Sequence, residues 1–280
     1  MQKNAVQSLV MNDGNRIPVL GFGTWQIENG KACVAAVEAA LESGYQHIDT
    51  ASDYGNEASV GEAIRHSGIP RKDLFVATKL FPGPDVGKVR EEMSKSLDRL
   101  SMDYVDLYLV HWPKDCYKEA WGVLETLQAE GRCRSIGVSN YTVSRFESDG
   151  FFEAARVTPA VDQIETNVFI QRPDLAAYCR RKGIRLQAYR PLAGAQEMKN
   201  DVLQDIAKRT GRTPAQVMLR FLVQKEIIAI PKTVTPARMR ENIAIFDFSL
   251  EPADMARLEG LHDARYLSLP LPGPIQKTWY

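Results

Sequence analysis

The stretch LYLVHWPKDCYKEAWGVLETL, residues 107–127, carries the pattern that decides the fold. It begins with a short apolar run, Leu107 to Val110, in which apolar and polar residues do not alternate. Apolar residues then recur at helical spacing at Ala120, Val123 and Leu127. Short continuous apolar runs are typical of strands buried on both faces, as in a parallel sheet. The stretch therefore predicts a strand followed by a helix.

The same alternation runs along most of the chain. Further apolar runs lie at residues 19–22, 47–49, 75–78, 134–138, 161–164, 184–189 and 227–230. Helical patterns follow these runs, which indicates repeated βαβ units. Eight such units in roughly 250 residues is the size of a TIM (β/α)8 barrel. We therefore expect residues 1–280 to form a single α/β domain of this kind.

The first twenty residues depart from the alternation. Asn12-Asp13-Gly14-Asn15 is typical of a tight turn between segments 7–11 and 16–20, with Asp13 and Gly14 supplying positive φ values. This predicts a β-hairpin that caps the bottom of the barrel. A second departure is an extra helix expected over residues 199–209, between the seventh strand and its own helix.

A doubly wound Rossmann sheet is the main alternative fold. Its fingerprint, G-x-G-x-x-G, follows the first strand. Gly21-Phe22-Gly23 begins in this way, but Gln26 stands where the third glycine or alanine belongs. The incomplete fingerprint favours the barrel.

The composition excludes several classes of protein. Of 280 residues, 25% are charged and 44% hydrophobic, and 35 basic residues balance 35 acidic ones. A general nucleic-acid binder normally has a basic excess, so we expect no nucleic-acid partner. No stretch approaches the ~18 apolar residues of a membrane span, and the N-terminus lacks the apolar core of a secretion signal. We expect a cytoplasmic protein with no membrane partner.

Cysteine and histidine spacing gives no metal or disulfide signal. Cys33, Cys116, Cys133 and Cys179 are scattered, without a C-x-x-C pair. A disulfide framework or zinc ribbon is therefore not expected, and a reducing cytoplasm fits this usage. The four histidines include no H-x-H or H-E-x-x-H pair, so we expect no catalytic metal.

Polar residues stand where several apolar runs end, and in this barrel chemistry lies at the C-terminal ends of the strands. Asp49 ends one run and Tyr54 lies just beyond it, while Lys79 and His111 follow the next two runs. Each alone has an ordinary structural explanation, such as a helix-capping acid or a packing tyrosine. Four such residues from neighbouring strands favour an active site.

These four residue types suit proton transfer to a carbonyl oxygen. A tyrosine hydroxyl has a pKa near 10 in water, so it is a weak acid at neutral pH. A lysine ammonium at ~4 Å, at an effective dielectric of ~20, stabilises the phenolate by up to ~4 kcal/mol, which predicts a lowered pKa for Tyr54. Asp49 would orient Lys79, and His111 would donate to the substrate carbonyl. The hydride must come from a cofactor.

A cofactor signal follows the last strand, in Ile230-Pro231-Lys232-Thr233 and the residues after it. Thr235 is a natural N-cap and Pro236 a natural first helical residue. A helix N-terminus near Lys232 and Arg238 can bind a phosphate, and barrels often have a phosphate site here. From this segment alone, a well-capped helix with surface cations explains the residues equally well.

Together these residues resemble the aldo-keto reductase superfamily, over nearly the whole chain from Gly21 to Asn242. The segments that carry the resemblance are GYQHIDTA (44–51), YGNE (54–57), IGVSNY (136–141) and IPKT (230–233). The compact, short-looped form is most similar to bacterial members that reduce diketogluconate, methylglyoxal and other small ketones or aldehydes.

The resemblance implies NADPH-dependent reduction of a small carbonyl compound. The implied catalytic tetrad is Asp49, Tyr54, Lys79 and His111. The implied cofactor contacts are the nicotinamide carboxamide with Ser139, Asn140 and Gln163, the nicotinamide ring with Tyr189, the 2′-phosphate with Lys232, Thr233 and Arg238, and the adenine with Glu241 and Asn242. Cations at the 2′-phosphate suit NADPH rather than NADH.

Aromatic side chains are expected to line the substrate pocket, since they exclude water and lie flat against a planar carbonyl. The residues expected there are Trp25, Tyr54, Phe81, Trp112 and Trp279. One residue departs from the family: Arg190 stands where a small residue commonly serves the cofactor pyrophosphate. The sequence leaves open whether Arg190 binds the pyrophosphate, closes over it or points to solvent.

Two other functions stay open. Some relatives of this fold are NADPH-binding regulatory subunits with little turnover, and the tetrad does not exclude that role. A Schiff-base lyase with Lys79 as nucleophile is a further alternative. The physiological substrate and the conformation of the Pro-rich segment 267–280 are not determined by the sequence. Members of this size are often monomers, so we expect a monomer.

Overall fold

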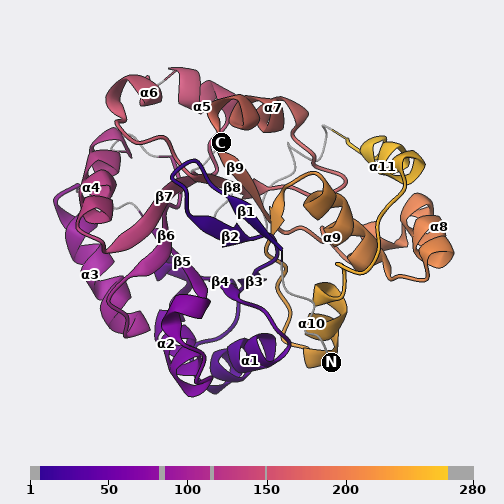
Figure 1. The fold of residues 1–280 in the computed structure, drawn as a ribbon, viewed down its shortest axis with the longest axis horizontal. Coiled ribbons are helices and arrows are strands. Elements are labelled where there is room, and N and C mark those ends of the chain that lie inside the picture. The colour runs from indigo at the N-terminus through magenta and orange to yellow at the C-terminus, as the bar shows by residue number, and fades with distance from the viewer. Residues whose placement is uncertain (1–6, 82–85, 114–116, 149, 264–280) are drawn as a thin grey trace.

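The computed structural model describes residues 7–81, 86–113, 117–148 and 150–263. Eight parallel strands form a curled sheet with helices around its outside and a small antiparallel hairpin near its axis (Figure 1). The strands bond in chain order, from β3 to β10. The alternation in the sequence therefore folds as the expected TIM (β/α)8 barrel with its N-terminal hairpin.

The strands are β1 (Ser8–Val10), β2 (Arg16–Pro18), β3 (Phe22–Gly23), β4 (His47–Asp49), β5 (Phe75–Leu80), β6 (Val105–Val110), β7 (Cys133–Ser139), β8 (Val161–Glu165), β9 (Arg185–Tyr189) and β10 (Ile228–Ala229). The α-helices are α1 (Lys31–Glu42), α2 (Glu57–His66), α3 (Val89–Leu100), α4 (Tyr117–Ala129), α5 (Val143–Ser148), α6 (Phe151–Ala154), α7 (Pro173–Lys182), α8 (Asp201–Thr210), α9 (Pro214–Gln224), α10 (Pro236–Ile243) and α11 (Pro252–Glu259). The short 3-10 helices are η1 (Ser52–Tyr54), η2 (Arg71–Asp73), η3 (Val86–Lys88) and η4 (Glu197–Lys199). Helix α8 is the extra helix expected over residues 199–209.

The first and last strand segments meet and close the barrel. Leu20 forms a parallel bridge with Ala229. The Ala229 amide donates to the Val19 carbonyl, and the Ala229 carbonyl accepts from the Gly21 amide, both at 2.9 Å. A Cβ on Gly21 would lie 2.7 Å from the ring of His47, so the packing of this segment against His47 of β4 requires glycine.

The N-terminal hairpin closes the bottom of the barrel. Strands β1 and β2 pair with Leu9 opposite Ile17. Ile17 and Met11 are buried and pack against interior residues of the barrel strands, among them Phe75 and Leu107. This apolar contact stabilises the expected cap. One detail of the turn was wrong: the positive φ, +85°, occurs at Gly14 and not at Asp13, because the loop is longer than a two-residue turn.

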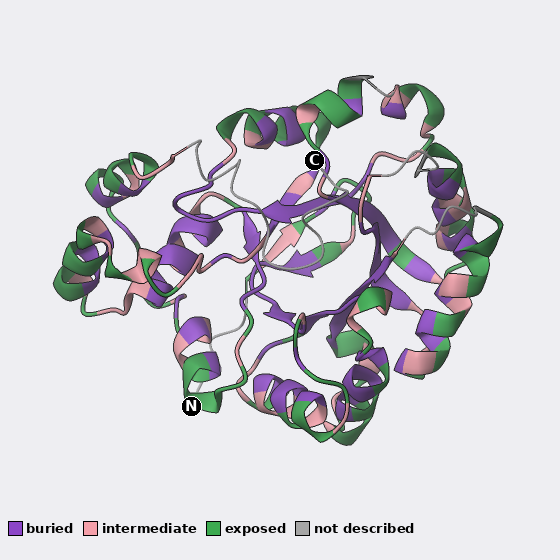
Figure 2. Ribbon diagram, turned by 180° about the vertical axis from the view of Figure 1, so that it is seen from behind, coloured by how far each residue is buried: buried purple, intermediate pink, exposed green. Residues whose placement is uncertain are grey.

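Most of the apolar core lies between the strands and the surrounding helices. Figure 2 shows the strands almost entirely buried and the helices buried on their inward sides. Helices α2 and α3 approach closely, because Gly61 faces the carbonyl of Leu100 with no side chain between them. Among the described residues, no helix combines the length and apolarity needed to cross a membrane.

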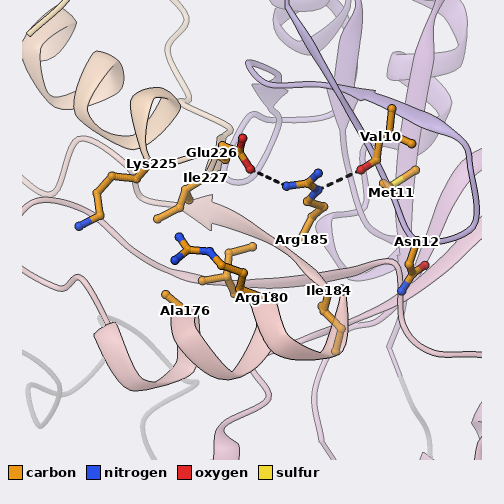
Figure 3. Close-up of a pocket in the computed structure, with 12 residues that line it drawn as sticks. Val10, Met11, Asn12, Ala176, Arg180, Ile184, Arg185, Lys225, Glu226 and Ile227 are labelled. Carbon is orange, nitrogen blue, oxygen red and sulfur yellow. Dashed lines mark hydrogen bonds and ion pairs between the residues drawn. The ribbon is translucent and has the colours of Figure 1, made fainter.

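A cavity of about 390 Å³ lies at the hairpin end of the barrel. Figure 3 shows residues of the hairpin, of helix α7 and of the loop before β10 around it. Arg185 crosses this space: its Nε donates to the Val10 carbonyl at 3.0 Å and its Nη1 lies 2.8 Å from Glu226. These contacts tie the hairpin to the barrel.

Three of the cysteines lie in the part of the chain that the structure describes. Cys33, Cys133 and Cys179 are buried free thiols, and burial raises the pKa of Cys33 to about 11 and that of Cys133 to about 12. Within the described ranges, no three His, Cys, Asp or Glu residues gather as a metal site. Cys116, Trp279 and the segment 267–280 lie outside the described residues.

Candidate active site

The four predicted catalytic residues meet at the C-terminal edge of the barrel. Asp49 ends β4, Lys79 lies near the end of β5, His111 follows β6 and Tyr54 ends η1. Side chains alternate along a strand, and Phe75 of β5 packs in the interior cluster with the hairpin, so Lys79 faces the interior as well. The barrel thus brings the four predicted catalytic residues together.

Lys79 is the centre of this cluster. Its fully buried Nζ lies 2.6 Å from Oδ1 of Asp49, 2.8 Å from the Thr50 carbonyl and 3.3 Å from the Tyr54 hydroxyl. Burial lowers the pKa of Lys79, and the Asp49 carboxylate opposes this shift. A buried ammonium needs such a partner, because an uncompensated charge in the interior is strongly unfavourable.

The pKa of Tyr54 moves in the direction opposite to the one expected. Burial raises it well above the ordinary value of 10.0, and the charges of Asp49 and Asp53 act in the same direction. The expected lowering by Lys79 fails because burial disfavours the charged phenolate, and because the negative charge of Asp49 also raises the pKa of Tyr54. Tyr54 is therefore held as a neutral phenol, the form that can give up a proton.

His111 lies beside Tyr54, with the ring centroids 5.7 Å apart and the rings edge to face. Burial lowers its pKa well below the ordinary value of 6.5, and the charge of Lys79 acts in the same direction. The imidazole is therefore neutral near pH 7, with one N–H donor. Its buried Nδ1 has no hydrogen-bond partner among the described residues, which leaves a polar atom for a ligand.

A cavity of about 410 Å³ opens at this edge of the barrel. Among its lining residues are His111 and four of the five residues expected to form the substrate pocket, Trp25, Tyr54, Phe81 and Trp112. Trp279, the other, lies outside the described residues, so its place stays a prediction.

The residues expected at the nicotinamide form one connected network beside the cavity. Tyr189 donates to Asn140 Oδ1 at 2.8 Å, and Asn140 Nδ2 lies 3.1 Å from the Ser139 hydroxyl. The Ser139 hydroxyl donates to the backbone carbonyl of Gln163 at 2.7 Å. Gln163 in turn donates its amide Nε2 to Oδ2 of Asp49 at 2.8 Å. The predicted cofactor residues therefore join the predicted catalytic ones directly.

The residues expected at the 2′-phosphate and adenine follow β10. Lys232 lines the cavity, and Arg238 is exposed on α10. The Thr233 hydroxyl accepts from the Thr235 amide at 3.1 Å, whereas Thr235, at the N-cap position, makes no side-chain capping bond.

The two residues expected at the adenine are less accessible. Asn242 is buried, and Glu241 accepts a hydrogen bond from the Thr213 hydroxyl at 2.7 Å. Neither lies among the residues that line the cavity. The residues expected at the 2′-phosphate and the adenine therefore begin at the edge of the cavity, at Lys232, and continue outside the cavity along α10.

The chain matches the sequence profile of the Aldo/keto reductase family over residues 19–263. It belongs to this family. Among curated proteins, this aldo/keto reductase is 38% identical over 265 residues to the glyoxal reductase of Bacillus subtilis, covering 94% of this chain and 95% of that protein. It is 35% identical over 292 residues to rat aldo-keto reductase family 1 member A1, covering 91% and 89%.

Solved structures agree with the fold. An aldo/keto reductase from Brucella melitensis superposes on this aldo/keto reductase with a TM-score of 0.87 at 40% identity, covering 91% of this chain and 99% of that one. An aldo-keto reductase from a Medee basin deep-sea metagenome library gives 0.89 at 38% identity, covering 98% and 100%. The expected resemblance to the family is therefore confirmed, and the chain is an oxidoreductase.

Asn56 was not assigned a role from the sequence, although it lies in the YGNE segment. It is fully buried; its Oδ1 accepts from the Thr50 hydroxyl at 2.9 Å and its Nδ2 donates to the carbonyls of Thr24 and Ile27 at 2.9 and 3.0 Å. These bonds tie the loop that carries Tyr54 to the loop after β3. The sequence marked the segment that contains Asn56 but gave no sign of this bracing role, because its partners Thr24 and Ile27 lie far from it along the chain.

Several lining residues of this aldo/keto reductase have left-handed backbone conformations. Gln26, Asn140, Arg190 and Ala193 have φ values of +59°, +66°, +48° and +50°. Such angles are uncommon for residues other than glycine and concentrate at functional sites. Sequence patterns gave no sign of this clustering.

Proposed function

We propose that this chain is a cytoplasmic, monomeric enzyme that reduces small aldehydes or ketones to alcohols with NADPH. The observation that carries the proposal is the place of the Tyr54 hydroxyl, 3.3 Å from the Lys79 ammonium and beside His111 at the wall of the cavity. The similarity to a glyoxal reductase supports a small carbonyl compound as substrate.

The residues present fit a nicotinamide dinucleotide. Ser139 and Asn140 offer hydroxyl and amide groups. The side-chain amide of Gln163 donates through Nε2 to Asp49, so its oxygen Oε1 is the atom that can accept from the carboxamide. The Tyr189 ring lies at the same wall of the cavity. Lys232 and Arg238 would hold the 2′-phosphate. The Nδ1 of His111, which has no hydrogen-bond partner among the described residues, supports a polar ligand in the adjoining cavity.

Residues of this chain supply the proton and bind the carbonyl oxygen. When bound, NADPH supplies the hydride to the carbonyl carbon. The Tyr54 hydroxyl donates its proton to the carbonyl oxygen, which becomes the alcohol hydroxyl, and the tyrosinate left behind is stabilised by the Lys79 ammonium. Asp49 holds Lys79 in place, and the neutral His111 donates a hydrogen bond that orients the carbonyl.

Aromatic walls complete the site. Trp25, Phe81 and Trp112 give the substrate end of the cavity flat, largely apolar surfaces. These surfaces exclude water from the reacting carbonyl, so the hydrogen bonds of Tyr54 and His111 act in a low-dielectric environment.

The geometry gives no support to Lys79 as a Schiff-base nucleophile. Its Nζ is fully buried, lies 2.6 Å from Asp49 and is absent from the described residues that line the cavity. An amine in this position is charged and shielded, whereas a Schiff-base nucleophile must be neutral and reach a carbonyl carbon.

The test is a reduction assay. Purified protein is mixed with NADPH and methylglyoxal, and the nicotinamide absorbance is followed, with a panel of aldehydes, ketoacids and diketo sugars ranked by kcat/KM. Turnover supports the proposal. Tight NADPH binding without turnover on any member of the panel would instead assign the chain as a nucleotide-binding subunit.

A further inference from the structure

Arg190 lies directly after Tyr189, at the end of β9, and lines the cavity. Its φ is +48°, and its carbonyl accepts hydrogen bonds from the Ala193 amide at 3.0 Å and from Asn167 Nδ2 at 3.3 Å. Two hydrogen bonds therefore hold the backbone in a conformation that is unfavourable for arginine. The turn fixes the direction in which this side chain leaves the strand end.

The guanidinium of Arg190 is held by a neighbouring acid. Its Nε lies 3.4 Å from Oε1 of Glu165, whose side chain is 11% exposed, while the Arg190 side chain is one third (33%) exposed. Arg172 also contacts Glu165, because its Nε donates to the Glu165 backbone carbonyl at 2.8 Å. This contact uses Nε, and the guanidinium carries two further NH₂ groups that can donate to an anion.

The proposed cofactor-binding residues and the order of groups along a dinucleotide together indicate where a pyrophosphate would lie. In the proposed function, the nicotinamide end would lie at Asn140 and Tyr189, and the 2′-phosphate end at Lys232 and the residues after it. A pyrophosphate lies between these two ends of the molecule. Among the described residues that line the cavity, the side chains with a fixed positive charge are Arg190 and Lys232.

We propose that Arg190, positioned by Glu165, binds the pyrophosphate of the cofactor. This inference rests on the proposed use of a nicotinamide dinucleotide. The planar guanidinium presents two parallel N–H donors to phosphate oxygens, and such charge-assisted pairs are stronger than neutral hydrogen bonds. The inference concerns a group that NADPH and NADH share, so it is separate from the choice between them.

The test measures nucleotide binding by quenching of tryptophan fluorescence, for which Trp25 and Trp112 at the cavity are suitable reporters. The variant is Arg190→Asn, because asparagine tolerates a left-handed backbone and removes the cation. We expect the Kd values for NADPH and NADH to rise by the same factor, about 10- to 100-fold. Arg190→Lys keeps the positive charge but not the planar guanidinium, so its Kd values should rise by a smaller factor.

Arg180 provides the control. It lies on α7 at the cavity of the opposite end of the barrel (Figure 3), where Arg180→Gln should leave both Kd values unchanged. Thermal unfolding checks that each variant is folded. Unchanged affinity of Arg190→Asn, or a loss confined to NADPH, would overturn the inference. Failure of the wild-type protein to bind either nucleotide would overturn the proposed function, and the inference with it.

Discussion

Gln163 donates its amide Nε2 to Oδ2 of Asp49 at 2.8 Å, while the other carboxylate oxygen of Asp49 accepts from Lys79 at 2.6 Å. Both oxygens of this buried carboxylate therefore accept a hydrogen bond, one from the ammonium of Lys79 and one from the amide of Gln163. A residue proposed to contact the nicotinamide thus orients the acid that holds Lys79. The proposed cofactor-binding and proton-transfer groups thus belong to one hydrogen-bonded network across β4, β5 and β8.

Removing the Tyr54 hydroxyl should abolish most of the turnover and little of the nucleotide binding. We expect Tyr54→Phe to lower kcat at least ~10²-fold, as is typical for loss of a general acid, because the ring and its packing are kept. Steady-state kinetics and an NADPH titration measure the two effects. Trp112→Phe is a suitable comparison, since it changes the cavity wall but not the acid; a near-normal rate for Tyr54→Phe would remove this hydroxyl from the mechanism.

The rate of reduction should depend little on pH near neutrality. Tyr54, with a raised pKa, stays protonated, and His111, with a lowered pKa, stays neutral. We expect kcat to change by less than about twofold between about pH 7 and pH 9, and to fall only at higher pH as Tyr54 loses its proton. A decline beginning near pH 7 would instead indicate the lowered tyrosine pKa that charge proximity to Lys79 alone suggests.

How much the sequence could predict follows from the type of signal each feature carries. The strands are buried on both faces, so their apolar runs are visible, and Asp49, Lys79 and His111 stand at the ends of those runs. The direction of the Tyr54 pKa shift could not be predicted, because it depends first on how deeply the hydroxyl is buried and then on the nearby charge of Asp49. The bracing by Asn56 and the left-handed turn at Arg190 depend on contacts between distant segments, which no local pattern shows.

His47 should make the folded state less stable in mild acid. Burial lowers its pKa from 6.5 to about 4. The unfolded chain therefore binds a proton at this site between pH 6.5 and pH 4 that the folded chain does not bind, so the free energy of unfolding falls as the pH falls. A difference of this size corresponds to about 3 kcal/mol for one fully buried group.

Urea unfolding of the wild type and of His47→Gln at several pH values measures this contribution. The difference between the two proteins isolates His47 from the other titrating groups, because those are present in both. We expect the free energy of unfolding to decline more steeply in the wild type across this window. If the free energy of unfolding depends on pH in the same way in both proteins, His47 binds its proton equally well in the folded and the unfolded state, and the prediction is wrong.

Arg238→Ala should weaken NADPH binding more than NADH binding. Arg238 is an exposed cation on α10, and its proposed ligand is the 2′-phosphate, a group that NADH lacks. Loss of one charge-assisted contact corresponds to a rise in the Kd for NADPH of roughly tenfold or more. Fluorescence titration with both nucleotides gives the ratio, and equal weakening of the two would reject the 2′-phosphate assignment.

Gly61→Ala should destabilise the fold, because a Cβ at this position would lie 2.2 Å from the backbone carbonyl of Leu100. That contact cannot be relieved by a side-chain rotation, so α2 and α3 must move apart, at a cost of about 1–3 kcal/mol or more.

The matched control is Gly122→Ala in α4, an exposed helical glycine whose Cβ would meet no atom within 4 Å. There the alanine should stabilise the protein by about 0.5–1 kcal/mol, because it loses less backbone entropy on folding. Opposite shifts of the unfolding midpoint in the two variants would assign the effect to the packing of α2 against α3, whereas a gain in stability at both positions would show that the two helices separate without cost.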